Sequence, residues 1–239
     1  RRGRRKEQLT DWIYRIDRQI ILMKQSSIFL HFGVAQCMLS SFLLFSCAPA
    51  TQLFKTEVIN VYATSAAQPW LTELYACAED SSVVLNVNAE SPDIYLRVGE
   101  PDILVSPAYQ IDEEEILIVT HRESPVQNLT LEEAQALFPQ GNASVQVWVY
   151  SSDADLQTVF DQLVMKGRSV TSFARVAVSP QNMSDVLSSE STAVGIVPRH
   201  WKAGNVREVF SAGVVPVLAI TKQEPQGVVM DLVSCLQRK

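Results

Sequence analysis

The sequence predicts an α/β protein, and three observations lead to that class. Strand-like and helix-like patterns alternate from residue 58 to residue 237, which is typical of α/β layers with largely parallel sheets. Of the 239 residues, 47% are hydrophobic and 19% are charged, so the chain has enough apolar material for a core and does not resemble a disordered or collagen-like sequence. No repeat or low-complexity tract interrupts the alternation. A chain of this length can form one domain or two small lobes.

The first part of the folded region combines short strands with one amphipathic helix. Leu71, Leu74, Tyr75 and Ala78 recur at i, i+3, i+4 and i+7, which predicts a helix over residues 68–79. Runs rich in Val and Ile predict strands at 58–63, 83–87, 103–105 and 115–119.

The next helix carries a clear start signal. Thr130 and Glu133 form the sequence pattern of a capping box, in which each side chain bonds the backbone of the other residue. Leu129 precedes the box, and Leu137 and Phe138 supply the apolar face.

The remaining elements continue the alternation to the end of the chain. We expect strands at 145–150, 175–178, 193–197, 209–210 and 215–221, and helices over 153–165, 183–187 and 227–237.

A targeting segment precedes this region. Lys24 follows Met23, residues 28–45 are mostly apolar, and Ser46 precedes Cys47, a pattern typical of a secretory signal peptide. A transmembrane helix is the alternative, but several Ser and Gln residues dilute the apolar run. The sequence Leu-Phe-Ser-Cys resembles the lipobox of bacterial lipoproteins. We therefore expect a signal peptide over 23–46, a lipidated Cys47, a linker over 47–56, and a membrane-anchored protein on the extracytoplasmic face.

Residues 1–22 are basic and precede Met23, which we interpret as the initiator methionine. Their Arg cluster could be a nucleic-acid patch, but the apolar run after Met23 favours another interpretation, positive charge held on the cytoplasmic side of a signal segment. We expect this extension to lie outside the mature protein.

The mature part is acidic. The whole chain has 20 Lys/Arg and 26 Asp/Glu, of which 8 and 3 precede Cys47, leaving 12 and 23 and a formal net charge of −11. Nucleic-acid affinity depends on neutralising phosphates with Lys and Arg. The charge therefore argues against a nucleic-acid partner.

The four cysteines separate by position. Cys37 lies in the signal and Cys47 is the proposed lipid site, which leaves Cys77 and Cys235 in the first and last helical patterns. In an oxidising compartment these two can form a disulfide, and two buried thiols are the alternative.

Two segments resemble one known family. The run SPVQNLTLEEAQALFPQG, residues 124–141, is similar to the segment that opens the second lobe of phosphate-type binding proteins, and STAVGIVPRHW, residues 191–201, resembles one of their strands. The resemblance covers most of residues 57–239. It implies a two-lobed periplasmic-binding-protein type 2 fold with the ligand in a cleft between the lobes. Lobe 1 would span 57–122 and 205–239, and lobe 2 would span 123–204.

The resemblance also implies where a ligand binds. In that family, loops at helix N-termini hold the anion with hydroxyl groups and free N–H groups. The corresponding candidates here are Thr64 and Ser65, which follow the first strand, and Ser152 and Asp153, which precede the lobe 2 helix with Ser152 as its N-cap. Ser106 is a further candidate, and Arg97 is the one cationic residue that we consider for the site. The first loop lacks the family's glycine, and the carboxylates beside Ser152 would repel a fully ionised anion. For each candidate, a cap, a turn or a surface charge is the alternative role.

The sequence does not predict an enzyme. His121 and His200 are the only imidazoles of the mature part, and no motif for a metal site, a nucleophile elbow or a phosphate loop is present. We expect a hinge or surface role for His121 and a solvated face for the acidic run 112–115. No cofactor and no metal are expected.

Two functions follow from the resemblance. The first is a lipid-anchored substrate-binding protein that captures a small solute, with an oxyanion such as phosphate as one candidate, and delivers it to an ABC permease. The second is a sensory or binding module of the same fold that has no transport role and has degenerate anion loops. The fold alone does not distinguish the two, because function depends on the site.

Overall fold

The computed structural model describes residues 56–81, 83–87, 90–141 and 144–238. The predicted basic extension, signal peptide, lipid site at Cys47 and most of the linker lie outside the described residues. The described region forms two lobes that share an eight-stranded sheet, in the order β2-β1-β3-β8-β4-β7-β5-β6. Its strands are β1 (Val58–Ala63), β2 (Val84–Val87), β3 (Ile94–Val98), β4 (Ala108–His121), β5 (Gln146–Tyr150), β6 (Arg175–Ala177), β7 (Ala193–Pro198) and β8 (Val206–Thr221).

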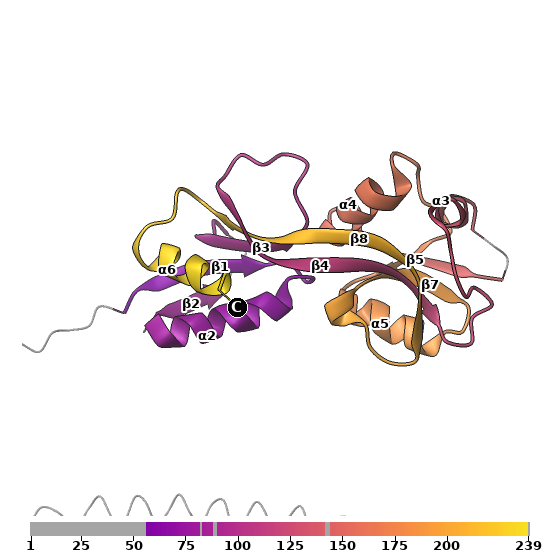
Figure 1. Cartoon of the computed structure of the whole chain (residues 1–239), viewed down its shortest axis with the longest axis horizontal. Helices are drawn as coiled ribbons and strands as arrows, with labels where there is room; N and C mark the ends of the chain where they lie inside the picture. Colours follow the sequence, from indigo (N-terminus) through magenta and orange to yellow (C-terminus); the bar gives the residue numbers. More distant parts are fainter. Residues whose placement is uncertain (1–55, 82, 88–89, 142–143, 239) are drawn as a thin grey trace, which may run out of the picture. The chain divides into compact units, whose positions relative to one another are not determined.

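Two long strands connect the lobes. β4 and β8 pair antiparallel from Ala108↔Ile220 to His121↔Val206, so the chain crosses into lobe 2 along β4 and returns along β8. In Figure 1 they run side by side from β3 to β7. β1 is parallel to β2 and β3, and β5 is parallel to β6 and β7. The expected parallel pairing therefore holds at both ends of the sheet, but the centre is antiparallel because the chain crosses it in both directions.

The helices divide between the lobes. Lobe 1 carries α2 (Gln68–Ser81) and α6 (Gly227–Leu236) with β1 to β3. Lobe 2 carries α3 (Leu131–Gln140), α4 (Asp155–Phe160), the π-helix η1 (Asp161–Met165), α5 (Pro180–Ser189) and the 3-10 turn η2 (Arg199–Trp201) with β5 to β7. In Figure 1, α2 and α6 lie together beside the lobe 1 strands, and α4 and α5 lie on opposite sides of the lobe 2 strands.

A disulfide ties the two helices of lobe 1. Cys77 on α2 and Cys235 on α6 are joined, with 6.1 Å between their Cα atoms, although they are separated by 158 positions in the sequence. These are the two cysteines that the sequence left over for a bridge. The disulfide fixes α2, and with it the loop between β1 and α2, on lobe 1.

The capping box of α3 is confirmed. The Glu133 N–H donates to Thr130 Oγ1 at 3.2 Å, and the Thr130 N–H donates to the Glu133 carboxylate at 2.7 Å. These two bonds satisfy donors that a helix start leaves free. They also hold the pKa of Glu133 below its usual range.

Two element predictions are wrong, and one strand was missed. Residues 103–105 form no strand: they lie in the connection between β3 and β4, where Ile103 and Val105 are mostly exposed and have no strand partner. Strand β3 was not predicted, although Ile94, Leu96 and Val98 alternate into the core. The two strands expected at 209–210 and 215–221 are one strand, β8, which continues through Gly213.

Candidate functional site

One carboxylate joins the two lobes. Asp155, the first residue of α4, accepts a hydrogen bond at 2.6 Å from the Thr64 hydroxyl and another at 3.1 Å from the Val98 N–H, both on the same oxygen. Its second oxygen accepts from the Leu156 N–H at 2.9 Å. Only 6% of Asp155 is exposed. A hydroxyl and an amide of lobe 1 thus meet a buried carboxylate of lobe 2.

The topology explains why these groups meet. Thr64 directly follows β1, and Val98 is the last residue of β3. Since β1 and β3 are parallel neighbours, their carboxyl ends lie at the same edge of the sheet, which is where open α/β sheets bind ligands. The Thr64 N–H donates to the Leu96 carbonyl at 3.0 Å and so fixes the loop to β3. We call Asp155 with Thr64 and Val98 the Asp155 cluster.

The charge of Asp155 acts on two tyrosines, and the charge of Arg97 acts on one of them. Burial raises the pKa of Tyr150 well above its usual value, and the charge of Asp155 raises it further. Burial also raises the pKa of Tyr95, while the charge of Arg97 lowers it and that of Asp155 raises it. Arg97 is 8% exposed, and its Nε is buried with no hydrogen-bond partner within the described ranges. The Asp155 carboxylate and a buried cation whose Nε lacks a partner therefore both act on Tyr95.

The structure brings together some of the predicted ligand residues and separates others. Thr64 contacts Asp155, and Arg97 precedes Val98 on β3. Ser65 is exposed beside Thr64. Ser106 is half-buried in the connection between β3 and β4. A role for any of them in binding a ligand stays a prediction.

The start of the lobe 2 helix differs from the expectation. α4 begins at Asp155 with Ala154 as its N-cap, so the predicted N-cap role of Ser152 is wrong. Ser152 and Asp153 are exposed in the preceding turn, and a bond from the Ser151 side chain lowers the pKa of Asp153. The helix predicted over 153–165 consists of α4 followed by the π-helix η1.

A second contact between the lobes lies beside the crossing strands. Glu114 on β4 is 1% exposed, and its Oε2 is 2.6 Å from His200 Nδ1 of η2. The His200 ring packs edge-on against Trp70 of α2, with 4.9 Å between ring centroids. Burial raises the pKa of Glu114, and the neighbouring His200 partly opposes that shift. The expected solvated face of residues 112–115 is therefore wrong for Glu114.

Further hydrogen bonds join the lobes near these two places. The Trp201 Nε1–H of η2 donates to the Ala66 carbonyl, which precedes α2, at 2.9 Å. At the surface, the Gln162 amide donates to Asp102 at 3.0 Å. The lobes are thus in contact through several residues on both sides of β4 and β8.

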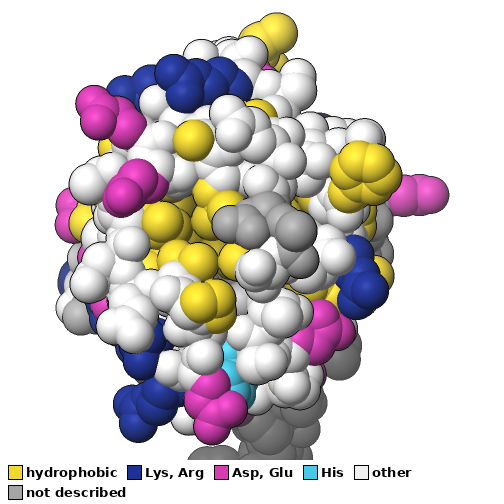
Figure 2. Space-filling view, turned by 90° about the vertical axis from the view of Figure 1, so that its right-hand side faces the viewer, with side chains coloured by type: hydrophobic (Ala, Val, Ile, Leu, Met, Phe, Trp, Pro, Cys, Tyr) yellow, Lys and Arg dark blue, Asp and Glu magenta, His cyan; other side chains and the backbone are white. Residues whose placement is uncertain are grey.

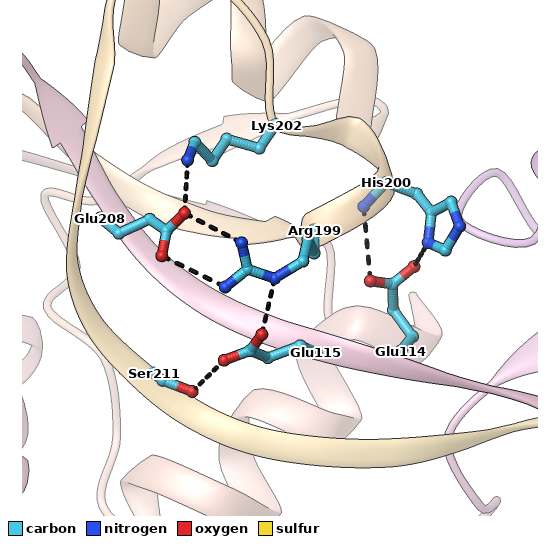
Figure 3. A network of polar contacts seen from close by, with 7 residues as sticks. All are labelled: Glu114, Glu115, Arg199, His200, Lys202, Glu208 and Ser211. Carbon is cyan, nitrogen blue, oxygen red and sulfur yellow. Dashed lines mark hydrogen bonds and ion pairs between the residues drawn. The ribbon is translucent and has the colours of Figure 1, made fainter.

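The other side of η2 carries an exposed ionic network (Figure 3). Arg199 Nε donates to Glu115 at 2.6 Å, and its two terminal nitrogens donate to Glu208 at 3.1 and 3.2 Å. Lys202 also pairs with Glu208, and the Ser211 hydroxyl donates to Glu115 at 2.6 Å. The hydrogen bonds from Arg199 and Ser211 lower the pKa of Glu115, and those from Lys202 and Arg199 lower the pKa of Glu208. We call these five residues the Arg199 network.

A pocket of about 480 Å³ lies at the far end of lobe 2, away from the Asp155 cluster. In Figure 2, apolar side chains gather in the middle of that face and charged side chains lie around them. The lining includes Phe173, which is 85% exposed, and otherwise mostly polar residues: Gln140, Gly141, Ser144, Val145, Gln146, Val147, Thr171 and Thr192. Among the described residues no charged side chain lines it, so this lining offers no ion pair to a charged solute.

Neither a metal site nor a membrane span occurs in the described part of the chain. No group of three or more His, Cys, Asp or Glu side chains is arranged there to hold a metal ion. None of the helices described is both long and apolar enough to cross a bilayer.

Comparison with known proteins identifies the fold. No family model matches the sequence, and no curated protein matches it. Among solved structures, a protein from Clostridium perfringens described as a phosphate ABC transporter substrate-binding protein, with bound phosphate, is similar at a TM-score of 0.66 and 14% identity, over 75% of this chain and 93% of that one. An ABC-type phosphate transport receptor from Vibrio cholerae has a TM-score of 0.59 and 13% identity, over 75% and 93%.

A regulator also shares the fold. The sulfate-bound regulatory domain of the OxyR2 E204G mutant from Vibrio vulnificus is similar at a TM-score of 0.58 and 9% identity, over 77% of this chain and 96% of that one. The chain therefore has the two-lobed periplasmic-binding-protein type 2 fold. The three proteins compared are binding proteins and a regulatory domain rather than enzymes. Identities this low establish the fold only.

The contact of Asp155 with lobe 1 was not predicted from the sequence. From the sequence alone, Asp155 was interpreted only as a negative charge near Ser152 that would repel an anion. The Asp-Ala-Asp sequence before an apolar helix face was the available signal, since a carboxylate in the first turn of a helix is favoured. Its contact with Thr64, 91 residues away, depends on the packing of the two lobes.

Proposed function

We propose that this chain is a lipid-anchored extracytoplasmic binding protein that holds a small solute between its lobes and presents it to the permease of an ABC importer. The observation that carries the proposal is the convergence of polar groups from both lobes at the carboxyl ends of β1 and β3, with Asp155 from lobe 2 and Thr64 from lobe 1. Two strands that cross between the lobes are the element that can bend as such a cleft opens and closes.

The comparisons support a binding role and place phosphate among the solutes to test. Both transport proteins described above are named for phosphate. Membrane attachment rests on the Leu-Phe-Ser-Cys pattern at Cys47. A lipid tether keeps a binding protein beside its permease, since two or more acyl chains give stable anchoring.

Native mass spectrometry of the protein purified without denaturation tests the binding role. We expect a co-purified small solute. Calorimetry with that solute, or with phosphate, sulfate, molybdate and neutral solutes, should give an affinity that Ser65→Ala or Ser152→Ala weakens by up to roughly a hundredfold if those hydroxyls bind it. Absence of a co-purified solute together with no binding across the panel would contradict the proposal.

Lipidation is tested separately. A clickable fatty acid fed to expressing bacteria should label the wild type and fail to label Cys47→Ala. Equal labelling of both proteins would remove the anchor from the proposal.

A non-transport sensory module is the second candidate. Two observations favour it: Asp155 already takes hydrogen bonds that a bound anion would receive, and a regulatory domain shares the fold. This candidate predicts solute binding without a permease partner. Cross-linking in the native membrane, with identification of any attached permease, distinguishes the two.

A further inference from the structure

We infer that Asp155 is an internal substitute for an anionic ligand, which latches the two lobes together and excludes small oxyanions from the cleft. The inference rests on the proposed function only in taking this cleft as the binding site. It names the class of solute that the wild-type cleft refuses, which includes phosphate, sulfate and simple carboxylates.

The hydrogen bonds of Asp155 are those of a bound anion. All three contacts have a protein donor: the Thr64 hydroxyl, the Val98 N–H and the Leu156 N–H. Two of the donors belong to lobe 1, so the carboxylate bridges the lobes in the way that a ligand held between them would. Charge-assisted bonds of this kind are about twice as strong as neutral ones.

Arg97 is the second observation that marks an anion site. Its side chain is more than nine-tenths buried, and its Nε has no partner among the residues that the structure describes. Arg97 directly precedes Val98 on β3, and its charge lowers the pKa of Tyr95 while the charge of Asp155 raises it. A buried N–H without an acceptor is costly, and an oxygen atom of an anion is the kind of acceptor that would satisfy the Arg97 Nε–H.

A tethered carboxylate has two advantages over a free anion. Because it belongs to the same chain, it competes at an effective concentration of the order of millimolar or higher, which a dilute solute does not reach. Its negative charge also repels a second anion within a few ångströms. The lobes should therefore stay closed without solute, and an oxyanion should not displace Asp155.

Chemical rescue tests the latch. Asp155→Ala removes the carboxylate and leaves the Thr64 hydroxyl, the Val98 N–H and Arg97 available to an added anion. We expect this variant to melt at a lower temperature in chloride, and formate, acetate or phosphate at equal ionic strength should raise its melting temperature. Asp153→Ala is the matched control, because Asp153 is exposed two residues away. It and the wild type should respond to the anions equally and weakly.

A second variant identifies the anion site. In the Asp155→Ala background, Thr64→Val should weaken formate or phosphate binding by roughly tenfold or more, since one charged hydrogen bond is lost. Amide exchange reports closure directly: the Val98 N–H should be protected in the wild type without solute, exchange faster in Asp155→Ala, and regain protection with formate. If Asp155→Ala does not fold, Asp155→Asn, which keeps the shape, should still show faster exchange at Val98.

The outcomes separate the two proposals. The latch would be overturned if anions changed the melting temperatures of the wild type, Asp155→Ala and Asp153→Ala equally. An unprotected Val98 amide in the wild type would also overturn it. Phosphate or sulfate binding to the wild type that Thr64→Val weakens would also overturn it, while supporting solute binding in the cleft. Anion rescue of Asp155→Ala alone supports the latch, even if the wild type binds no solute and the proposed transport function fails.

Discussion

Two neighbouring glutamates of β4, Glu114 and Glu115, face opposite sides of the sheet and lie in different environments. Glu114 is 1% exposed and has His200 as its side-chain partner, whereas the Glu115 side chain is 28% exposed and lies within the Arg199 network (Figure 3). Burial raises the pKa of Glu114, and hydrogen bonds lower the pKa of Glu115. Adjacent residues with the same side chain thus differ in whether desolvation or hydrogen bonding dominates.

The two glutamates contact different parts of the molecule. We call Glu114 with His200 the buried side of β4, and Glu115 with the Arg199 network the exposed side. The buried side reaches α2 through the packing of His200 on Trp70, so it connects lobe 2 to the helix that follows the Thr64 loop. The exposed side links β4, β8 and η2 to one another. We therefore expect the buried side, with the Asp155 cluster, to control how the lobes sit together, and the exposed side to add little.

Removing the disulfide should lower the stability most, and it should affect the buried side of β4 more than the exposed side. The double variant Cys77→Ala/Cys235→Ala frees α2 from α6, and loss of the long closed loop should lower the free energy of unfolding by roughly 2 to 5 kcal/mol. Since α2 carries Trp70, the variant should alter the buried side and leave the Arg199 network in place. Urea unfolding measures the stability, and the Trp70 indole resonance measures the local change.

Reduction of the wild type provides the control for this variant. It should reproduce the same loss without a change of sequence. An unchanged Trp70 signal in both cases would mean that α2 does not depend on the bridge.

Glu114→Gln and Glu115→Gln form a matched pair for pH. The folded-state pKa of Glu114 is raised, so its contribution to stability is full below the ordinary glutamate value of roughly 4.3 and is lost as pH rises through the raised pKa. The stability of the wild type relative to Glu114→Gln should therefore fall as pH rises above roughly 4.3.

Glu115 should show the opposite sign. Its folded-state pKa is lowered, so its contribution is present above the ordinary value and is lost as pH falls through the lowered pKa. The stability of the wild type relative to Glu115→Gln should fall as the solution is acidified. Chemical unfolding of the three proteins as a function of pH checks both signs, and parallel curves for the two variants would show that burial does not separate the glutamates.

How far the sequence could predict this structure depends on whether a signal was local. The α3 capping box needs only Thr130 and Glu133, three residues apart, and it is correct. β1 was predicted with its observed bounds because most of its residues, Val58, Ile59, Val61 and Tyr62, are of types that favour strands. Strand β3 was not predicted, although the alternation that places Ile94 and Leu96 in the core is a local signal in the sequence.

The missed features of the site are long-range. The hydrogen bond from Thr64 to Asp155 spans 91 residues, and the bond from His200 to Glu114 spans 86. Acidic runs usually lie in solvent, whereas Glu114 is buried and its carboxylate pairs with His200 of η2. Composition and spacing could indicate which side chains are able to bind an anion, but not that the chain supplies its own carboxylate there.

The smallest effect should come from the exposed side. Arg199→Ala removes the hydrogen bonds to Glu115 and Glu208, yet 48% of the Arg199 side chain is exposed, so solvent and salt screen these pairs. We expect a loss of less than about 1 kcal/mol in the free energy of unfolding, and the loss should shrink as salt is raised. Arg175→Ala is the comparison, since Arg175 has a single, longer ion pair with Glu190 and should cost less still. A salt-independent loss above roughly 2 kcal/mol for Arg199→Ala would instead mean that the network helps to hold the crossing strands in register, and that the two sides of β4 are closer in importance than their burial indicates.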